Sequence, residues 1–315
     1  MRKFMAMVMA GVAGCASIPM QARAQAAPEA FEHQDQTAPG FADFLAVDGK
    51  TVWATNRGRV EQWSRTGKLA EVPMTHPCGA MAIVGNDMWV ADCEERTLNK
   101  IDMRAAKVTA VVHSGIASPK GETAVVFGAG SIWAASDAKG VIARVDPATN
   151  SVIASIAVDP DTYYLAYAFG ALWAVSDSHQ SIQKIDPATN TVVKRTPLGQ
   201  QSSFMAVSDK AVWVIEQGDG TVARIDSKSG EVTGRVKVGD ALKFADIDAG
   251  GGKVWVRTRV DQVFVVIDPK SATIKARVGA SMRGGGLRWS PEGLWTSEHD
   301  LNLLSWWPHP EKIGN

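Results

Sequence analysis

The sequence predicts an all-β fold, a seven-bladed β-propeller of four-stranded antiparallel blades. A motif of about forty residues recurs along the chain, and each copy carries a tryptophan at the same place. The anchoring tryptophans follow one another at intervals of 36, 44, 40, 40, 42 and 40 residues: Trp53, Trp89, Trp133, Trp173, Trp213, Trp255 and Trp295. Repeats of this length, made of short strand patterns, are typical of propeller blades.

Each repeat contains four short strand patterns separated by turn residues. In the fifth repeat these are residues 203–207, 212–216, 221–226 and 231–238. The first two patterns are apolar on both faces, as a sheet between two neighbouring sheets requires. The fourth alternates apolar and charged residues, so we expect one wet face. Because the tryptophans lie in the second pattern, we expect them to pack between blades.

The turn between the third and fourth strand patterns has its own signature. Residues 146–150 and 186–190 both read Asp-Pro-Ala-Thr-Asn, in which Asp caps the turn, Pro presets φ and Asn tolerates the left-handed conformation. Gly67 and Gly230 stand at the Asn position in two other repeats, as that conformation predicts. Ala272 stands there in the sixth repeat, so we expect that hairpin to be built differently.

The last repeat ends after its third strand pattern, at Trp306-Trp307-Pro308. A propeller closes its ring to remove the exposed edges of its end blades. We therefore expect residues 29–35 to form the outer strand of the last blade. The predicted organisation is a signal peptide at 1–24, an N-terminal segment at 25–40 that includes this strand, one propeller domain at 41–310 and a tail at 311–315.

The N-terminus reads as an export signal. Arg2 and Lys3 precede an apolar run at residues 4–13, which is too short to span a membrane as a mature helix. Pro19 and the small-x-small triplet at 22–24 predict cleavage after Ala24. A rival site, Val-Ala-Gly-Cys at 12–15, would leave Cys15 acylated as a lipoprotein anchor. Both alternatives place the protein in the periplasm or outside the cell.

Charge and motif content exclude several classes of protein. Removing residues 1–24 leaves 30 Lys and Arg against 33 Asp and Glu, a net charge of −3. This balance gives no general attraction to nucleic acid or anionic membranes, and we expect a monomer without a transmembrane segment. The sequence contains no nucleophile elbow, phosphate loop, haem-attachment motif or Rossmann fingerprint.

Two cysteines remain after cleavage, Cys78 and Cys93. They flank a predicted hairpin at nearly equal distances from its turn, so antiparallel pairing brings them face to face. In an oxidising compartment this predicts a disulfide. The alternative is a soft metal site, for copper or electron handling, that also uses His76 and Asp92.

The loops that enter the first strand and leave the tryptophan strand of each blade lie on one face, around the mouth of the central channel. Ligand sites on propellers commonly lie there. Candidates from the entering loops are Asp43, His76, Glu122, Asp161, Tyr163, Tyr164, Ser202, Phe204, Lys243, Asp246 and Arg283. Candidates from the leaving loops are Asn56, Arg57, Asp92, Asp137, His179, Glu216, Arg257, Arg259, Glu298 and His299.

Two hypotheses follow from these loops. Aromatic and basic side chains would bind an aromatic, anionic small molecule by stacking and charge-assisted hydrogen bonds. They are Tyr163, Tyr164, Phe204, Lys243, Arg257, Arg259, Arg283 and His179. The second hypothesis is catalysis: Glu216 and Glu298 would hold a divalent cation such as Mg²⁺, and His299 would act as general base. The alternative is that Glu216, Glu298 and His299 are ordinary solvated loop residues.

The repeats VARIDPATNSVIASIAV and IQKIDPATNTVVKRTPLG resemble those of the YVTN-repeat propellers, which are exported proteins. LWTSEHDLNLLSWWP is similar to the repeats of the streptogramin (virginiamycin B) lyases, seven-bladed propellers with a Trp-Phe-Thr-Glu motif. That resemblance implies metal-assisted elimination that opens a cyclic depsipeptide, with a His base and Glu-held Mg²⁺. The motif Glu matches Glu216 and Glu298, and His299 would be the base. Ser136, Ser176 and Thr258 replace the motif Glu in three blades.

The sequence therefore predicts an exported propeller that binds a small molecule or a partner protein at the channel mouth. The alternative is a lyase or hydrolase that acts on a small aromatic or cyclic substrate at the same mouth.

Overall fold

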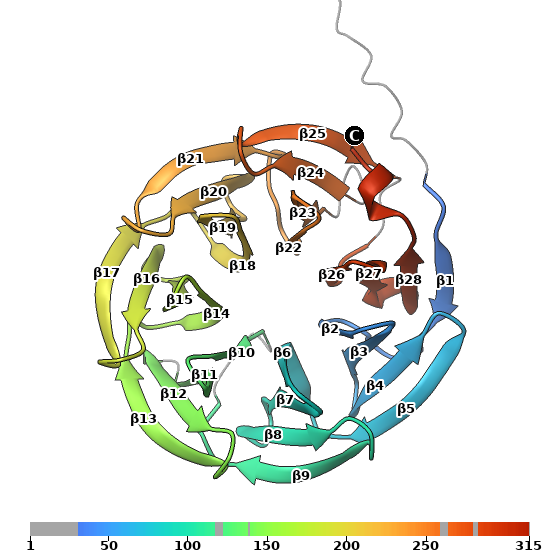
Figure 1. The fold of residues 1–315 in the computed structure, drawn as a ribbon, viewed down its shortest axis with the longest axis vertical. Helices are drawn as coiled ribbons and strands as arrows, with labels where there is room; N and C mark the ends of the chain where they lie inside the picture. Colours follow the sequence, from blue (N-terminus) through green and yellow to red (C-terminus); the bar gives the residue numbers. More distant parts are fainter. Residues whose placement is uncertain (1–30, 117–121, 138, 259–263, 280–282, 315) are drawn as a thin grey trace, which may run out of the picture.

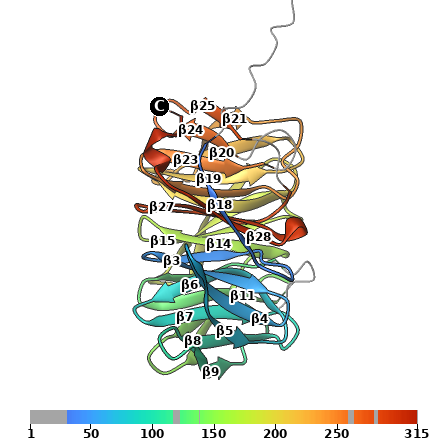
Figure 2. The same cartoon turned by 90° about the vertical axis from the view of Figure 1, so that its right-hand side faces the viewer.

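The computed structural model describes residues 31–116, 122–137, 139–258, 264–279 and 283–314. These residues form seven four-stranded antiparallel sheets around a central axis (Figure 1). Seen edge-on, the ring is a thick disc (Figure 2). Beside the strands, the described ranges contain two short 3₁₀ helices, η1 (His299–Leu301) and η2 (Pro310–Lys312). The prediction of an all-β, seven-bladed propeller is confirmed.

In each of the first six blades, the strands follow chain order from the central axis to the rim. Their bounds are β2 (Leu45–Asp48), β3 (Thr51–Asn56), β4 (Arg59–Ser64), β5 (Gly67–Pro73); β6 (Pro77–Val84), β7 (Asp87–Asp92), β8 (Thr97–Asp102), β9 (Lys107–Val112); β10 (Val125–Gly128), β11 (Ser131–Asp137), β12 (Val141–Asp146), β13 (Ser151–Ala157); β14 (Thr162–Ala168), β15 (Ala171–Ser176), β16 (Ser181–Asp186), β17 (Thr191–Pro197); β18 (Ser202–Ser208), β19 (Ala211–Glu216), β20 (Thr221–Asp226), β21 (Val232–Lys237); and β22 (Asp246–Gly250), β23 (Lys253–Arg257), β24 (Phe264–Asp268), β25 (Thr273–Val278).

The seventh blade combines both ends of the chain. It contains β26 (Leu287–Ser290), β27 (Gly293–Glu298), β28 (Leu303–Trp307) and, on its outer side, β1 (Gln34–Thr37). β1 pairs antiparallel with β28 in a register that runs from Gln34 opposite Trp306 to Thr37 opposite Leu303. The segment expected in this place, residues 29–35, overlaps β1 only at its last two residues, and residues 29 and 30 lie outside the described residues.

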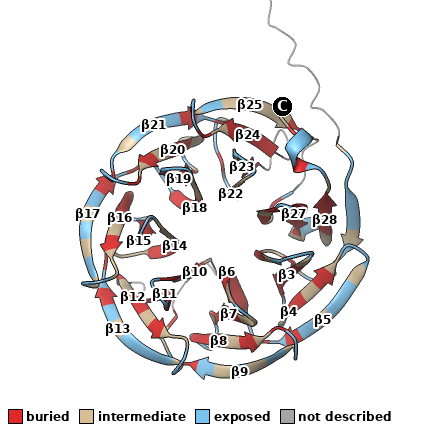
Figure 3. Cartoon of the chain, in the orientation of Figure 1, coloured by how far each residue is buried: buried red, intermediate tan, exposed pale blue. Residues whose placement is uncertain are grey.

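Burial follows the order of strands within a blade (Figure 3). The tryptophan strand of each blade is buried, whereas the outer strand alternates between exposed and covered residues, as β17 does. All seven anchoring tryptophans are at most 1% exposed. They share apolar clusters with the following blade, as Trp213 does with Val254 and Trp89 with Ile132, so the predicted packing between blades is confirmed.

Several of these tryptophans also contact a basic side chain, which extends toward the next blade. Lys100, Arg144 and Lys184 pair across the strands with Trp89, Trp133 and Trp173 and lie over their rings at 5.7, 4.7 and 5.2 Å. Each then donates a hydrogen bond to a turn carbonyl of the following blade: the acceptors are Pro147, Pro187 and Ser227. Cation–π contact and hydrogen bond together fix the spacing between successive blades.

The four-residue turns between third and fourth strands share one geometry. The first blade differs: only two residues separate the paired Ser64 and Gly67, and Gly67 has a φ of 145°, so the left-handed conformation expected of it is wrong. Asp146 accepts a hydrogen bond from the backbone N–H of Ala148 (2.9 Å), and Asn150 has a φ of 55°. Ala272 has a φ of 53°, and its N–H donates to the carbonyl of Asp268 at 2.9 Å. The expectation that this hairpin is built differently is therefore wrong, because the rest of the turn holds Ala272 in the left-handed conformation despite its Cβ.

Cys78 and Cys93 form a disulfide, with their Cα atoms 6.0 Å apart, as predicted. The two sulfurs are therefore unavailable to the alternative, a thiolate metal site. Asp92, which that site also required, accepts hydrogen bonds from the backbone N–H groups of Thr75 and Glu95 instead. Among the described residues, no helix is long and apolar enough to cross a membrane.

Candidate functional site

A cavity of about 540 Å³ lies at one mouth of the ring. Its lining comes from loops that lead into the inner strands β2, β6, β10, β22 and β26 and from loops that leave β3 and β27. These belong to the loops that the sequence predicts around the mouth. The lining residues are Phe41, Asp43, Phe44, Thr55, Asn56, Arg57, His76, Pro77, Cys78, Glu122, Phe244, Gly284, His299 and Asp300.

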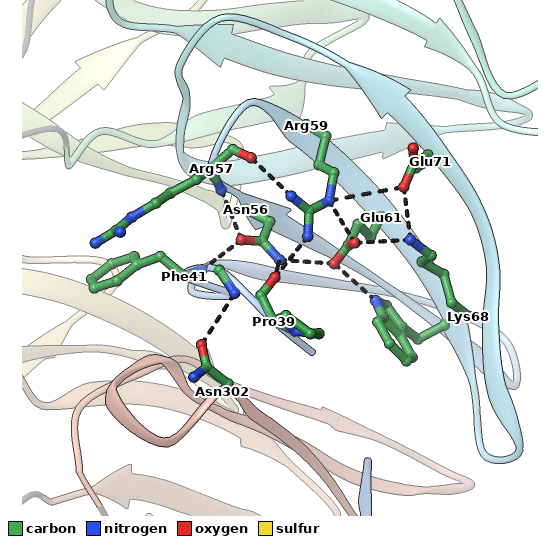
Figure 4. A network of polar contacts seen from close by, with 11 residues as sticks. Pro39, Phe41, Asn56, Arg57, Arg59, Glu61, Lys68, Glu71 and Asn302 are labelled. Carbon is green, nitrogen blue, oxygen red and sulfur yellow. Dashed lines mark hydrogen bonds and ion pairs between the residues drawn. The ribbon is translucent and has the colours of Figure 1, made fainter. Parts of the chain in front are cut away.

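One wall of the cavity is held by the hydrogen-bond network in Figure 4. Asn56, the buried last residue of β3, accepts hydrogen bonds at Oδ1 from the backbone N–H groups of Phe41 (2.5 Å) and Arg57 (2.8 Å). Its Nδ2 donates to the carbonyl of Pro39 (3.1 Å) and to Oε2 of Glu61 (2.9 Å). The loop before β2 is therefore fixed to the first blade, and with it the backbone of Phe41.

Glu61 supplies the negative charge of this network. Its buried carboxylate accepts hydrogen bonds from Nε of Arg59 at 2.7 Å and from Nε1 of Trp63 at 3.3 Å. Burial would raise the pKa of Glu61, but the hydrogen bonds from Arg59 and Asn56 hold it below its ordinary value. The carboxylate stays ionised, so the network persists at neutral pH.

Asn302, which follows η1, joins the same loop to the seventh blade. Its carbonyl accepts from Ala38 N–H at 2.8 Å and its Oδ1 accepts from Gly40 N–H at 3.1 Å. Gly40 has a φ of 121°, and a Cβ at this position would lie 2.2 Å from Oδ1 of Asn56. Glycine is required here for both reasons.

His299, the first residue of η1, lies in the cavity wall. Its ring stacks on Phe41 with a centroid distance of 4.0 Å, and its Nδ1 lies 3.0 Å from Oδ1 of Asp300. The side chain is 16% exposed. A Cβ on Gly284 would lie 2.9 Å from Nε2 of His299, so the glycine leaves room for the ring. A histidine held by a carboxylate inside a cavity is suited to proton transfer.

Asp43 is a second titratable group in the cavity wall, directly before β2. Burial raises its pKa to about 7, and the negative charges of Glu122 and Asp246 add to the increase, while Arg257 and Arg288 oppose it. Its side chain keeps contact with the cavity, because the residue is only half-buried. Asp43 therefore exchanges a proton near neutral pH in a place that a ligand can reach.

Next to Asp43, the aromatic side chains of Phe44, Phe204 and Tyr164 contact one another. Tyr164 Oη donates to Oε2 of Glu122 at 2.6 Å, and burial together with that carboxylate raises the pKa of Tyr164 well above its usual value. Phe204 lies edge-on to Tyr164 (centroids 4.7 Å apart) and next to Phe44 (5.9 Å). Tyr163, also expected at the mouth, is buried elsewhere and donates to Asp161.

The position of Glu298 does not fit the expected metal-binding and catalytic role. The side chain is fully buried and does not line the cavity. Its Oε1 lies 2.9 Å from Nη2 of Arg257, and its Oε2 accepts from Oγ of Ser305 at 3.2 Å. Because Arg257 is itself buried, the two charges neutralise each other away from water.

Glu216 occupies the equivalent position in the fifth blade and is also fully buried. It accepts a hydrogen bond from Gly199 N–H at 2.7 Å and lies 2.9 Å from Nε of Arg235. A divalent ion would have to displace an arginine from each of these carboxylates. Over the described ranges, no group of three or more His, Cys, Asp or Glu residues could hold a metal ion. The pair Glu216 and Glu298 therefore does not fit the Mg²⁺ site that the resemblance implies.

The basic residues expected to attract an anion are not gathered at the cavity. Arg257 is paired with Glu298, and Arg283 and His179 are exposed outside the cavity lining. Arg259 lies outside the described residues. Lys243 lines a neighbouring hollow of about 210 Å³, where its ammonium lies 5.0 Å from the ring centre of Phe244.

The sequence reasoning missed three phenylalanines of the cavity, Phe41, Phe44 and Phe244, and gave no preference to Asp43. One sequence feature could have identified Asp43: it is an acidic residue directly before an apolar inner strand. No local pattern could single out the phenylalanines, since they converge from loops about 200 residues apart.

Fold and cavity together define a seven-bladed propeller with a preformed pocket at one mouth. No protein-family model matches the chain, and no curated protein sequence matches it. In solved structures it is similar to the Kuenenia stuttgartiensis hydrazine synthase (TM-score 0.71, 16% identity, covering 87% of this chain and 97% of that one). It is also similar to a streptogramin B lyase (TM-score 0.70, 14% identity, 87% and 96% covered) and to the computationally designed Ika8 protein (0.65, 12%, 89% and 99%). At these identities the likeness establishes the fold, which is that of the streptogramin lyases, as the sequence resemblance implies.

The raised pKa of Asp43 predicts how the stability of the protein depends on pH. Its pKa is raised from 3.8 to about 7 on folding, so the folded protein retains this proton where the unfolded chain releases it. The stabilisation is complete below pH 3.8 and is lost as the pH rises through 7. The difference in melting temperature, Asp43→Asn minus wild type, should therefore increase by about 5 °C between pH 4 and 7 and then remain constant.

Scanning calorimetry at intervals from pH 4 to 8 measures this difference. Asp48→Asn, at the exposed end of β2 in the same blade, is the control and should show no such trend. A constant difference between Asp43→Asn and wild type over this range would contradict the assignment.

Proposed function

We propose that the protein binds a small organic molecule with an aromatic or other apolar part in the cavity at the channel mouth. The observation that carries this proposal is the lining: phenyl rings of Phe41, Phe44 and Phe244 surround a cavity of about 540 Å³, together with the carboxylates of Asp43 and Glu122. Cavities of a few hundred Å³ that combine apolar walls with a few polar groups are typical of small-molecule sites.

The rigidity of the cavity supports the same function. Two of its described loops are tied to buried side chains: Asn56 holds the backbone of Phe41, and Asp92 holds that of His76. Asn302 ties the first and seventh blades together at the same place. A site that is organised before the ligand arrives loses less conformational entropy on binding.

Gly284→Val tests this proposal. The new side chain starts 2.9 Å from Nε2 of His299 and 3.7 Å from Cβ of Phe244, so it fills part of the cavity. A fragment library is screened against the mature protein by ligand-observed NMR, and the hits are then titrated. We expect the Gly284→Val variant to weaken their binding by at least about tenfold, or roughly 1.4 kcal/mol.

Gly234→Val is the matched control, because nothing lies within 4 Å of a Cβ at this position of the outer strand β21. Hits that bind both variants equally well would show that they bind elsewhere. A screen without hits, together with a protein that co-purifies with wild type but not with Gly284→Val, would replace the small molecule by a partner protein.

A second candidate function is acid–base catalysis on the bound molecule, as a lyase or hydrolase. It is favoured by one observation: His299, held by Asp300, and Asp43, with its pKa of about 7, line the same cavity. Groups that exchange protons near the working pH are the most effective acids and bases. His299 would serve as the base, and Asp43 would supply or accept the second proton.

His299→Ala tests the catalytic candidate. Each binding fragment is incubated with enzyme, and product is followed by liquid chromatography and mass spectrometry. We expect any turnover to fall at least about 100-fold in His299→Ala. The control is His309→Ala, in the exposed segment after β28, which should keep wild-type turnover. Unchanged turnover, or a large loss of thermal stability in His299→Ala, would assign the ring a structural role.

We also propose that the protein is exported and cleaved after Ala24. The Cys78–Cys93 disulfide supports this, because such bonds form and persist mainly outside the cytoplasm. Intact-mass spectrometry of protein expressed with its own N-terminus should give a chain that begins at Gln25 and contains no free thiol. A lipid adduct on Cys15 would instead establish the lipoprotein alternative, and a full-length reduced chain would contradict export.

A further inference from the structure

The hollow of about 210 Å³ that Lys243 lines is directly joined to the main cavity. Glu122 and Phe244 line both spaces, so the two adjoin at these residues. A water molecule occupies about 30 Å³ in the liquid, so the hollow has room for one six-membered ring with its substituents. We refer to it as the polar hollow, because its other lining residues include Asp177, Gln201, Ser202, Gln217 and Lys243.

Uncharged polar side chains give the polar hollow its capacity for hydrogen bonds. Oε1 of Gln217 accepts from the backbone N–H of Phe244 at 3.3 Å, which leaves the hydrogens on its Nε2 for other acceptors. Ser202 is buried and donates its Oγ–H to the carbonyl of Gly199 at 2.9 Å, so its oxygen can accept. Gln201 carries an amide that donates and accepts. A ligand group that does both at several atoms matches this set.

Charges of both signs line the two spaces. In the polar hollow, Lys243 accompanies Asp177 and Glu122, and Glu122 already accepts a hydrogen bond from Tyr164. The main cavity contains Arg57 and two histidines as well as carboxylates. The lining therefore singles out neither a cation nor an anion, and hydrogen bonds rather than net charge would select the ligand.

Phe244 is the aromatic residue shared by the two spaces. Its φ is 60°, in the left-handed region that bulky side chains rarely adopt, and residues held in this way are concentrated at functional sites. The residue is 47% exposed, so a ligand can reach it. The face of a phenyl ring is electron-rich and attracts C–H groups that carry a small positive charge. Phe244 is thus placed to contact a ligand that extends from one space into the other.

We propose that the ligand is an uncharged glycoside, with its sugar ring in the polar hollow and its aromatic or apolar part in the main cavity. This inference rests on the proposed function and specifies the chemical class of its ligand. Each sugar hydroxyl donates and accepts, as Gln201, Ser202 and Gln217 do, and the C–H face of the sugar packs on Phe244. A ring without hydroxyl groups would displace water from these side chains and leave them without partners, which costs free energy.

Matched probes test the proposal. They are the phenyl glycosides of glucose, galactose and mannose, then 2-phenoxytetrahydropyran, which has the same ring without hydroxyl groups, and phenyl glucuronide, which adds a carboxylate. All are titrated by ligand-observed NMR against the full mature protein at pH 7. We expect at least one phenyl glycoside to bind at least about tenfold more tightly than both 2-phenoxytetrahydropyran and phenyl glucuronide.

Gln201→Gly tests the placement of the sugar. It removes the amide, and glycine suits the left-handed conformation of this residue, which has a φ of 52°. The preference for the glycoside over 2-phenoxytetrahydropyran should fall at least about threefold. Gln180→Gly is the matched control, because Gln180 is also exposed and left-handed (φ 46°) but is not among the residues that line the two spaces. An unchanged preference in Gln201→Gly, or an equal loss in both variants, would contradict the placement.

The probes also separate this inference from the proposed function. Equal affinity for the glycosides and 2-phenoxytetrahydropyran would overturn the sugar assignment while the proposed binding function stands. Tighter binding of phenyl glucuronide would overturn it as well, in favour of an anionic ligand. If no probe binds, the sugar assignment is overturned, and the wider fragment screen alone decides the binding function.

Discussion

The structure depends on one constraint: a four-stranded blade is apolar on both faces and cannot exist alone in water. The anchoring tryptophans meet this constraint, since each is fully buried in a contact between neighbouring blades. Lys100, Arg144 and Lys184 strengthen the contact, because each lies over a tryptophan ring and donates to a turn of the following blade. In these three contacts, one repeated pair of side chains contributes to both the packing and the spacing of the blades. A ring assembled in this way is a stiff support for loops.

The same repeat also organises the mouth. The residue that ends the tryptophan strand is buried and polar in several blades, and it binds the loop that leads into its own blade. Asn56 and Asp92 accept backbone N–H groups of these loops directly, and Glu216 does so at Gly199. Glu298 is paired with Arg257 of the preceding blade instead. The acidic residues among these resemble catalytic carboxylates in sequence, but their side chains hold loops in place or pair with an arginine. The titratable groups that line the cavity are others, such as Asp43 and His299.

The cavity at the mouth is lined by aromatic rings and a few titratable groups. Asn56 holds the backbone of Phe41 (Figure 4). The ring of His299 stacks on Phe41, so the network that fixes this loop also supports the imidazole. Asp43 and Glu122 bring negative charge close to phenyl rings within the same cavity. Acid–base chemistry requires a titratable group in contact with a ligand, and Asp43, whose pKa is raised to about 7 at the cavity wall, meets that requirement.

The sequence by itself determined the fold, the blade number, the burial of the tryptophans and the Cys78–Cys93 bond. Each of these follows from a local, repeated pattern or from two positions across one hairpin. It also predicted which loops surround the mouth where the cavity lies, since the blade order decides which turns meet there. Only the tertiary structure decided which side chains reach the cavity. Glu298 and Arg257 turn inward to neutralise each other, whereas Asp43, Phe41 and Phe244 come together from distant blades, and such convergence depends on three-dimensional packing that no local pattern records.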